Sequence, residues 1–301
     1  MSTSTASPKE PPVQALLQTL RHERRNLLFR RISRNQLLVT GGVIFLLMLL
    51  AVLLGPVLLG QDPFAVNPPN RLHGPGGGHV LGTDTFGRDL ASRILDGGRS
   101  SMVIGCSVAV LTSAFGLVVG LYSAFYRRVG AVLMRITDGL MAFPAILLAI
   151  AIMAALGAKT SNVVIALTVV FTPHVARVVR SAALVVKNQT YVEALNALGS
   201  GSTRILWLNV VPNVLSPLVV QATFIFADSL IVEAALSFVG AGVPAPAPSW
   251  GNILYEGKTV IYNGWWMTVF PGLAIMLTVL SINLLGDGLR DLLDPHQSKT
   301  R

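Results

Sequence analysis

Six long apolar stretches constrain this chain more than any other feature of its sequence. They cover about residues 36–59, 101–125, 139–156, 163–186, 214–239 and 267–285. Each approaches the ~20 mostly apolar residues that a helix needs to cross a bilayer. The sequence therefore predicts an all-α polytopic membrane protein with six transmembrane helices.

The composition supports this class and excludes others. Hydrophobic residues make up 52% of the 301 residues and charged residues only 12%, about half of the ~25% usual in soluble domains. Disorder, a coiled coil and almost any water-soluble enzyme are excluded. Cys106 is the only cysteine, which excludes an intrachain disulfide and a cysteine-based metal cluster.

Basic residues orient the spans. If the N-terminus is cytoplasmic, all but six of the 23 lysines and arginines fall on the inner side, as the positive-inside rule requires. The net charge of +9 follows from this bias. No basic stripe is interleaved with aromatic residues, so we expect no nucleic-acid partner. Both termini are predicted to be cytoplasmic.

The spans divide the chain into three parts. Residues 1–35 form a basic cytoplasmic segment, residues 36–290 a six-span domain and residues 291–301 a cytoplasmic tail. Apolar positions such as Leu16, Leu20 and Leu27 among the basic residues predict an amphipathic helix on the inner membrane surface; a solvated tail that only fixes topology is the alternative. Residues 60–100 and 240–266 are the long outer segments, and residues 187–208 the inner loop.

No catalytic or metal-binding constellation emerges. The five histidines are scattered. Asp84 and Asp89 lie close together, but ion pairs with Arg88 and Arg93, with Thr83 or Asp84 capping a helix, explain them better than acid–base chemistry.

The segment GNILYEGKT resembles a phosphate-binding loop. It has five residues between its glycines instead of four, and it lies in the second outer segment. We therefore expect no ATP binding there.

Two carboxylates lie within the fifth span. Such groups normally face a cavity or a partner, because exposure to lipid is costly. Asp228 and Glu233 are separated by about 140° around a helix, so they do not share one narrow face. Of the two, Asp228 is the better candidate for lining a pathway, although structural packing between subunits is the favoured interpretation. Glu233 is expected to be a structural hydrogen-bonding group.

The inner loop is the most informative segment. A short helix, residues 191–198, is predicted to end at Gly199 and to present a knob to the cytoplasm. This knob could dock in a groove of another subunit; an ordinary amphipathic connector is the alternative.

This loop resembles the signature loop of ABC-importer permeases, Glu-Ala-Ala followed by glycine and a later proline. Here it reads Glu193, Ala194 and Leu195, then Gly199 and Pro212. Leu195 replaces the second alanine, and Asn209 replaces an isoleucine. The segments HVLGTDTFGRDLASRILDGGRSSM, EAALSFVGAGVPAPAPSWGNIL and FPGLAIMLTVLSINLLGDGLRDLLDP resemble the C-type permeases of dipeptide, oligopeptide and nickel importers.

The resemblance implies the type I permease fold and a subunit of the bacterial cytoplasmic membrane that is not an enzyme and binds no cofactor. Its partners would be a second homologous permease, two cytoplasmic ATPase subunits that use ATP and Mg, and an extracytoplasmic solute-binding protein. Peptides are the default substrate; nickel chelates and glutathione stay open.

The resemblance also implies site residues. The helix that docks in the ATPase groove would contain Tyr191, Glu193, Ala194, Leu195 and Gly199. In the second outer segment, Trp250 and Asn252 are the candidates for facing the binding protein.

Two other functions are the alternatives to an importer subunit. An ion-gradient-driven secondary transporter would need inverted repeats or broken helices with polar groups that converge near the midplane, and Asp228 alone is a poor ion site. A membrane-embedded enzyme would need a cluster of nucleophile, base or metal ligands at one depth, and the sequence offers none.

Overall fold

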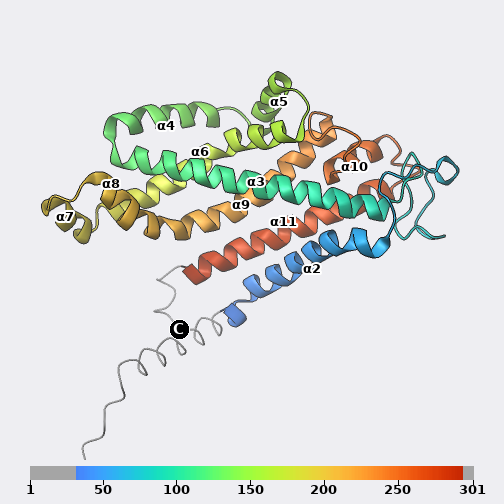
Figure 1. The fold of residues 1–301 in the computed structure, drawn as a ribbon, viewed down its shortest axis with the longest axis horizontal. Helices are drawn as coiled ribbons and strands as arrows, with labels where there is room; N and C mark the ends of the chain where they lie inside the picture. The colour runs from blue at the N-terminus through green and yellow to red at the C-terminus, as the bar shows by residue number, and fades with distance from the viewer. Residues whose placement is uncertain (1–31, 294–301) are drawn as a thin grey trace, which may run out of the picture.

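The computed structural model describes residues 32–293, and these residues form helices and loops without a β-strand. Figure 1 shows the helices as one elongated bundle. The predicted surface helix of the N-terminal segment and the tail beyond residue 293 lie outside the described residues. The longer helices are α2 (Gln36–Leu59), α3 (Leu90–Phe125), α4 (Arg127–Met141), α5 (Ala145–Leu156), α6 (Thr160–Lys187), α9 (Val211–Val239) and α11 (Trp266–Leu293).

Shorter elements occupy the two ends of the bundle. At one end lie α7 (Thr190–Ala197), α8 (Ser202–Ile205) and the π-helical segment η2 (Leu206–Val210). At the other end lie the 3-10 turn η1 (Pro68–Asn70) and α10 (Trp250–Lys258). The two long segments predicted to lie on the outer side are therefore side by side, opposite the predicted inner loop.

Five helices within residues 32–293 are long and apolar enough to cross a membrane. The number of spans rises to six if a bent pair of helices forms one further span. The five helices include α2 and α6, close to the predicted bounds, and α11, which continues to Leu293 beyond the predicted end at residue 285. The second span begins at Leu90 instead of near residue 101. Asp89 caps this helix, because its Oδ2 accepts a hydrogen bond from the backbone N–H of Ser92 at 2.8 Å.

The third span differs from the prediction of one helix over residues 139–156. The chain there forms α4 and α5, which are bent by 95° at a short break. Pro144 precedes α5, and proline disfavours helical backbone at the residue before it. With 12 residues, α5 is about 18 Å long, too short to cross ~30 Å of hydrocarbon alone.

The fifth span is longer than predicted. Helical structure runs from Ser202 to Val239 through α8, η2 and α9. Pro212, which has no N–H to donate to a continuing helix, follows the π-helical turn η2 almost directly, and such turns mark irregularities inside helices. The inner loop is thus joined to the spanning helix by continuous helical backbone.

Close packing in the bundle depends on glycines. A methyl group at Gly116 of α3 would lie 2.5 Å from Val175 Cγ1 of α6, and one at Gly120 would lie 2.6 Å from Val179 Cβ. The small residues spaced by four therefore let α3 and α6 approach each other. On α11, Gly288 similarly faces the backbone N of Leu38 in α2.

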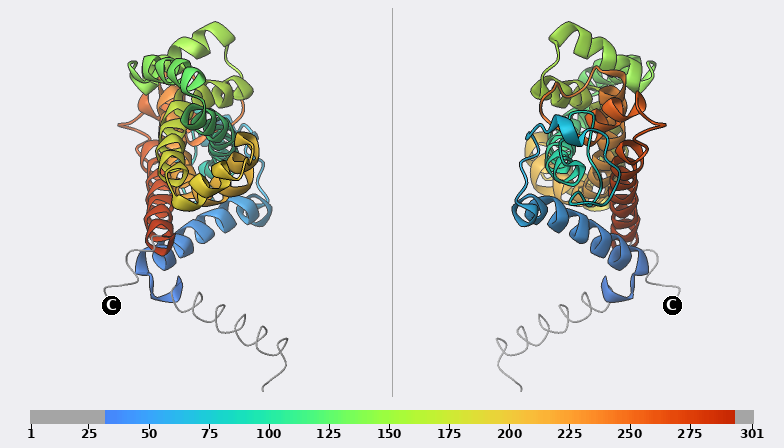
Figure 2. Two further views of the ribbon diagram at one scale, coloured as in Figure 1. Left: turned by 90° about the vertical axis from the view of Figure 1, so that its left-hand side faces the viewer. Right: turned by 90° about the vertical axis from the view of Figure 1, so that its right-hand side faces the viewer.

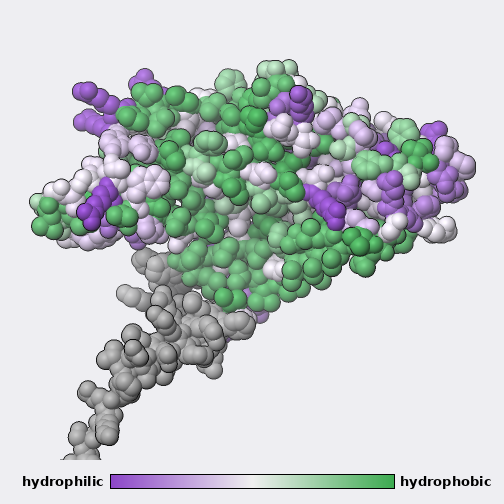
Figure 3. Space-filling model, viewed as in Figure 1, coloured by the Kyte–Doolittle hydropathy of each residue, from purple (hydrophilic) through white to green (hydrophobic). Residues whose placement is uncertain are grey.

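The bundle has an apolar middle and two polar ends. Figure 3 shows the hydrophobic belt, and Figure 2 shows α2 and the α4–α5 pair on opposite sides of the core helices. In α2 only Gly41, Val52 and Gly55 are buried, although the helix is apolar all round. Such a helix is suited to contact with lipid.

Candidate coupling and translocation surfaces

The α7 helix projects from one end of the bundle (Figure 1). Val192 is buried and fixes its inner side, whereas Tyr191, Glu193 and Ala194 are exposed. Leu195 is half-buried against the apolar core. Leu195 replaces the signature alanine with a larger side chain. This side chain packs toward the protein, so the solvent-exposed face of α7 is unchanged.

Gly199 ends this knob in a left-handed conformation with φ of 78°. The Gly199 N–H donates to Asn196 O, and the Ser200 N–H donates to Leu195 O, each at 3.0 Å. These bonds satisfy carbonyls at the end of α7, as glycine caps do. The predicted short helix and its glycine stop are confirmed.

The knob is tied to the fifth span. Asn213 Nδ2 donates to the Tyr191 hydroxyl at 3.3 Å and to Asn209 O at 2.7 Å. Next to this contact, Trp207 and Leu208 are exposed. Sequence reasoning did not single out these two residues, although large apolar side chains in a short inner loop are a signal for a docking surface.

Asp228 is exposed on the surface of α9 in the single subunit. Among residues 32–293 it makes no hydrogen bond or ion pair, and its electrostatic neighbour is His174 of α6. Because a charged side chain in a span is costly in contact with lipid, this face of α9 needs water or a partner.

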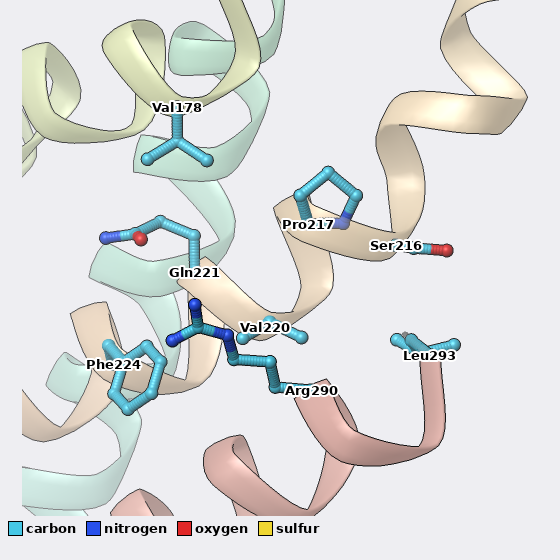
Figure 4. A pocket seen from close by; sticks show the side chains of 8 residues that line it. All are labelled: Val178, Ser216, Pro217, Val220, Gln221, Phe224, Arg290 and Leu293. Carbon is cyan, nitrogen blue, oxygen red and sulfur yellow. The ribbon is translucent and has the colours of Figure 1, made fainter. Parts of the chain in front are cut away.

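A cavity of about 400 Å³ lies between α6, α9 and α11. Figure 4 shows the Arg290 side chain reaching from α11 toward Gln221 and Phe224 of α9, with Val178 of α6 opposite. Arg290 also makes no ion pair or hydrogen bond within the described part of the chain.

Glu233 has the structural role that was expected. It is 1% exposed and accepts hydrogen bonds from the Ser237 hydroxyl at 2.8 Å and the Ser101 hydroxyl at 3.2 Å. The Ser101 hydroxyl also accepts the Trp250 N–H at 3.3 Å. The carboxylate thus joins α9, α3 and the start of α10.

The end of the bundle that bears η1 and α10 contains an ion-pair cluster of Asp84, Arg88, Arg93 and Glu256, in which only Glu256 is partly exposed. Arg88 Nε lies 2.5 Å and Arg93 Nε 3.3 Å from Asp84 Oδ2. Arg88 Nη2 lies 2.9 Å from Glu256 Oε2, and Arg93 Nη2 lies 3.0 Å from Glu256 Oε1. The expected ion pairs of Asp84 are confirmed, and Glu256 of α10 is a partner that the sequence did not indicate.

The expected cap was wrong. Asp84 accepts the backbone N–H groups of Phe86 and Arg88 within its own turn, and Asp89 caps the helix instead. Asp89 Oδ1 also lies 2.9 Å from His79 Nδ1. The two aspartates therefore have local structural partners.

Trp250 and Asn252 do not face outward as expected. Trp250 is 1% exposed, and its Nε1–H donates to Ile94 O at 2.9 Å. Asn252 is also buried, and its Nδ2 donates to Val243 O and Ala247 O. Both side chains hold the second outer segment together, which corrects their assignment to a surface that contacts a binding protein.

The segment resembling a phosphate loop is the helix α10. A methyl group at Gly251 would lie 2.6 Å from the Ala234 Cα of α9. This glycine is therefore needed for the packing of α10 on α9.

The comparisons with known proteins identify the family. Residues 116–299 match the binding-protein-dependent transport system inner membrane component family, and residues 26–75 match the N-terminal TM domain of oligopeptide transport permease C. This chain belongs to the binding-protein-dependent transport permeases. The resemblance seen in the inner loop is thus confirmed. The chain is a component of a binding-protein-dependent transport system, which replaces the two alternatives of a secondary transporter and an enzyme.

The similarity between this permease and its relatives extends over nearly the whole length of both proteins. A putative peptide transport system permease of Brucella abortus is 46% identical over 267 residues, which cover 89% of this chain and 90% of the relative. The dipeptide transport system permease protein DppC of Alkalihalophilus pseudofirmus is 40% identical over 268 residues, covering 89% of this chain and 88% of that protein.

Solved structures support the permease fold. A chain of the MetNI methionine ABC transporter in an inward-facing conformation aligns with a TM-score of 0.54 at 24% identity. The alignment covers 67% of this permease and 96% of that chain. The predicted all-α ABC-importer permease fold is confirmed.

Proposed function

We propose that this permease is the C-type pore-forming subunit of an ATP-driven importer for peptides or a related small solute. The peptide substrate is supported by the names of its relatives, among them the peptide and dipeptide permeases. The observation that carries the proposal is α7, an exposed helical knob at the opposite end of the bundle from the two long outer segments.

The end that bears α7 is the cytoplasmic one in this proposal. Basic residues gather there, including Arg127, Arg128, Lys187 and Arg204, as the positive-inside rule expects. The N- and C-termini are then cytoplasmic as well, and the subunit resides in the bacterial inner membrane.

In this proposal, α7 couples ATP hydrolysis to transport. Tyr191, Glu193 and Ala194 contact the groove of an ATPase subunit, while Leu195 and Gly199 fix the position of the helix. Two partner ATPase subunits use ATP and Mg; this chain supplies no catalytic residue. A short turn joins α7 to the helical run that begins at Ser202 and continues through η2 and α9. Because Asn213 of α9 also donates to the Tyr191 hydroxyl of α7, a push on α7 is transmitted to the fifth span.

A second homologous permease completes the pathway, and Asp228 lines it from this side. An extracytoplasmic binding protein delivers the solute to the outer end. Since Trp250 and Asn252 are buried, we assign this contact to exposed side chains of the same segments, such as Val80 and Tyr262, which are 71% and 97% exposed.

The test is affinity purification of the tagged permease from its native membranes, followed by identification of the chains that copurify. We expect a second permease and ATPase subunits. In a Glu193→Lys, Ala194→Asp variant we expect the second permease to remain and the ATPase subunits to be lost.

Asn263→Lys is the matched control, because Asn263 is exposed at the opposite end. It adds a positive charge and is expected to retain the ATPase subunits. Recovery of the ATPase subunits at the wild-type level with the α7 variant would contradict the coupling role. Purification of the permease without any ATPase would contradict the importer as a whole.

A further inference from the structure

One face of the bundle carries polar side chains that the fold does not use. On α9, Gln221, Phe224 and Asp228 recur at intervals of three and four residues, so they share one side of the helix. Gln221 and Phe224 line the cavity of about 400 Å³, and Asp228 lies one turn beyond Phe224. The cavity and the carboxylate thus belong to one continuous surface, which we call the transit face.

The neighbouring helices extend the transit face. Val178 of α6 lines the cavity, and His174 lies one turn before it, near Asp228. From the other side, the Arg290 guanidinium of α11 reaches toward Gln221 and Phe224 (Figure 4). The transit face therefore carries Asp228, with His174 beside it, at one level and the cationic Arg290 at the level of the cavity.

The polar side chains of the transit face are left largely unpaired in the part of the chain that the structure describes. Within residues 32–293, Gln221, Asp228 and Arg290 make no hydrogen bond or ion pair. An unpaired charge such as Asp228 within a span is too costly to face lipid, and Arg290 lines the cavity from the last turn of α11. The transit face therefore requires water or a polar ligand.

We propose that the transit face is a transit site for a small zwitterion, with the solute ammonium at Asp228 and the solute carboxylate at Arg290. Gln221 and Phe224 lie between the two charges. The proposal rests on the proposed importer function and adds the chemistry by which the pore itself recognises the solute.

The dimensions fit a short peptide. Gln221 and Asp228 are seven positions apart, which corresponds to about 10 Å along a helix. An extended chain of two or three residues spans about 7–11 Å. The cavity volume also lies in the range of ~300–1,000 Å³ that is common for small-molecule sites.

An anionic lipid headgroup is the other ligand that would pair with Arg290. Such a headgroup would leave Asp228 unpaired and would place negative charge on the same face as this carboxylate. A ligand that carries both charges satisfies both groups, so the observations favour the zwitterion.

The test uses the accessibility of a cysteine in the transit face. Cys106 is the only cysteine and is exposed, so Cys106→Ala gives a clean background in which Phe224→Cys is added. The variant, assembled with its partner subunits, is reconstituted in liposomes. We expect a membrane-impermeant maleimide to label this cysteine from the cytoplasmic side.

The dipeptide Ala-Ala at millimolar concentration, added to the same side without binding protein, is expected to slow this labelling several-fold. N-acetyl-alanine amide, which is similar in size but uncharged, is expected to have no effect. Adding Asp228→Asn should abolish protection by Ala-Ala. Leu47→Cys on the exposed side of α2 is the control, and we expect it to remain unlabelled.

Three results would overturn the transit site. These are absence of labelling at Phe224→Cys, equal protection by the capped compound, or protection that depends on anionic lipid and not on Ala-Ala. If Phe224→Cys does not assemble, Gln221→Cys replaces it, since it lines the same cavity. ATPase subunits present in the same liposomes show that a negative result concerns the transit site and not the importer.

Discussion

The Arg93 guanidinium and the Glu256 carboxylate form an ion pair at 3.0 Å between residues that are 163 positions apart. Arg93 is 1% exposed and the Glu256 side chain 17%, so the pair is largely buried. It joins the start of α3 to α10 and, through Asp84, to the first outer segment. The surface that a binding protein would meet is therefore built on a buried ionic connection between both outer segments.

Removing one partner of this cluster should destabilise the outer end. In Glu256→Ala, Arg88 and Arg93 share only Asp84, and the loss of a buried partner typically costs about 3–5 kcal/mol. We expect a clear drop in the melting temperature in detergent and faster proteolysis within residues 60–89.

Asp62→Asn is a suitable control for this experiment, because Asp62 is exposed and the amide keeps the oxygen that accepts the Phe64 N–H. It should change neither measurement. An unchanged melting temperature in Glu256→Ala would show that the cluster does not hold the outer segments together.

Glu233 should tolerate an amide but not an apolar side chain. Glu233→Gln keeps the oxygen that accepts from a serine hydroxyl, and we expect transport and stability close to the wild type. Glu233→Leu leaves the hydroxyls of Ser101 and Ser237 without this acceptor, at a cost of about 1–3 kcal/mol.

The comparison of the two Glu233 variants also tests for proton transfer. Gln cannot exchange a proton, so a loss of uptake in Glu233→Gln at unchanged melting temperature would contradict a purely structural carboxylate. Uptake of a labelled peptide and thermal unfolding in detergent are the two measurements.

The sequence predicted those features that depend on local patterns. The spans at α2, α6 and α11 follow from hydropathy, and the end of α7 follows from the glycine at position 199. The ion pairs of Asp84 with Arg88 and Arg93 were predictable because these residues are close along the chain. Each of these signals is contained within a few helical turns.

Features that depend on distant contacts were not predictable. Glu256 joins the ionic cluster from α10, and nothing near it in the sequence indicates Arg93 as its partner. Trp250 and Asn252 lie in a polar outer segment but are buried, because α10 packs against α11 and α9 and also contacts α3. In the third span, hydropathy alone did not show that Pro144 would divide the helix.

The glycines between α3 and α6 predict a rescue experiment. In Gly116→Ala, the new methyl group would lie 2.5 Å from Val175 Cγ1, and overpacking of this kind typically costs about 1–3 kcal/mol. Adding Val175→Ala removes the contact with Cγ1 but leaves the Cβ of residue 175 at 2.6 Å from the new methyl group, so the double variant should recover only part of the lost melting temperature.

Gly272→Ala is the matched control for the rescue, since it lies in α11 with nothing within 4 Å of the added methyl group. It should be neutral or slightly stabilising, because alanine is favoured over glycine in a helix. Equal losses in Gly116→Ala and Gly272→Ala would contradict close packing of α3 on α6.

Gly199 allows the coupling role of α7 to be tested through the backbone alone. Its φ of 78° is unfavourable for residues with a side chain, by roughly 1–2 kcal/mol, yet no atom lies within 4 Å of an added Cβ. Gly199→Val should therefore disturb the end of the knob without a steric clash, whereas Gly199→Asn should be tolerated, because asparagine adopts this conformation more readily.

We expect Gly199→Val to lower peptide-stimulated ATP hydrolysis by the assembled transporter several-fold and Gly199→Asn to retain most of it. The number of permease molecules in the membrane should be similar for both variants, because Gly199 lies outside the core. If both lose ATP hydrolysis equally, the contact surface of residue 199 matters more than its backbone conformation. If neither does, the geometry at the end of α7 is not part of the coupling.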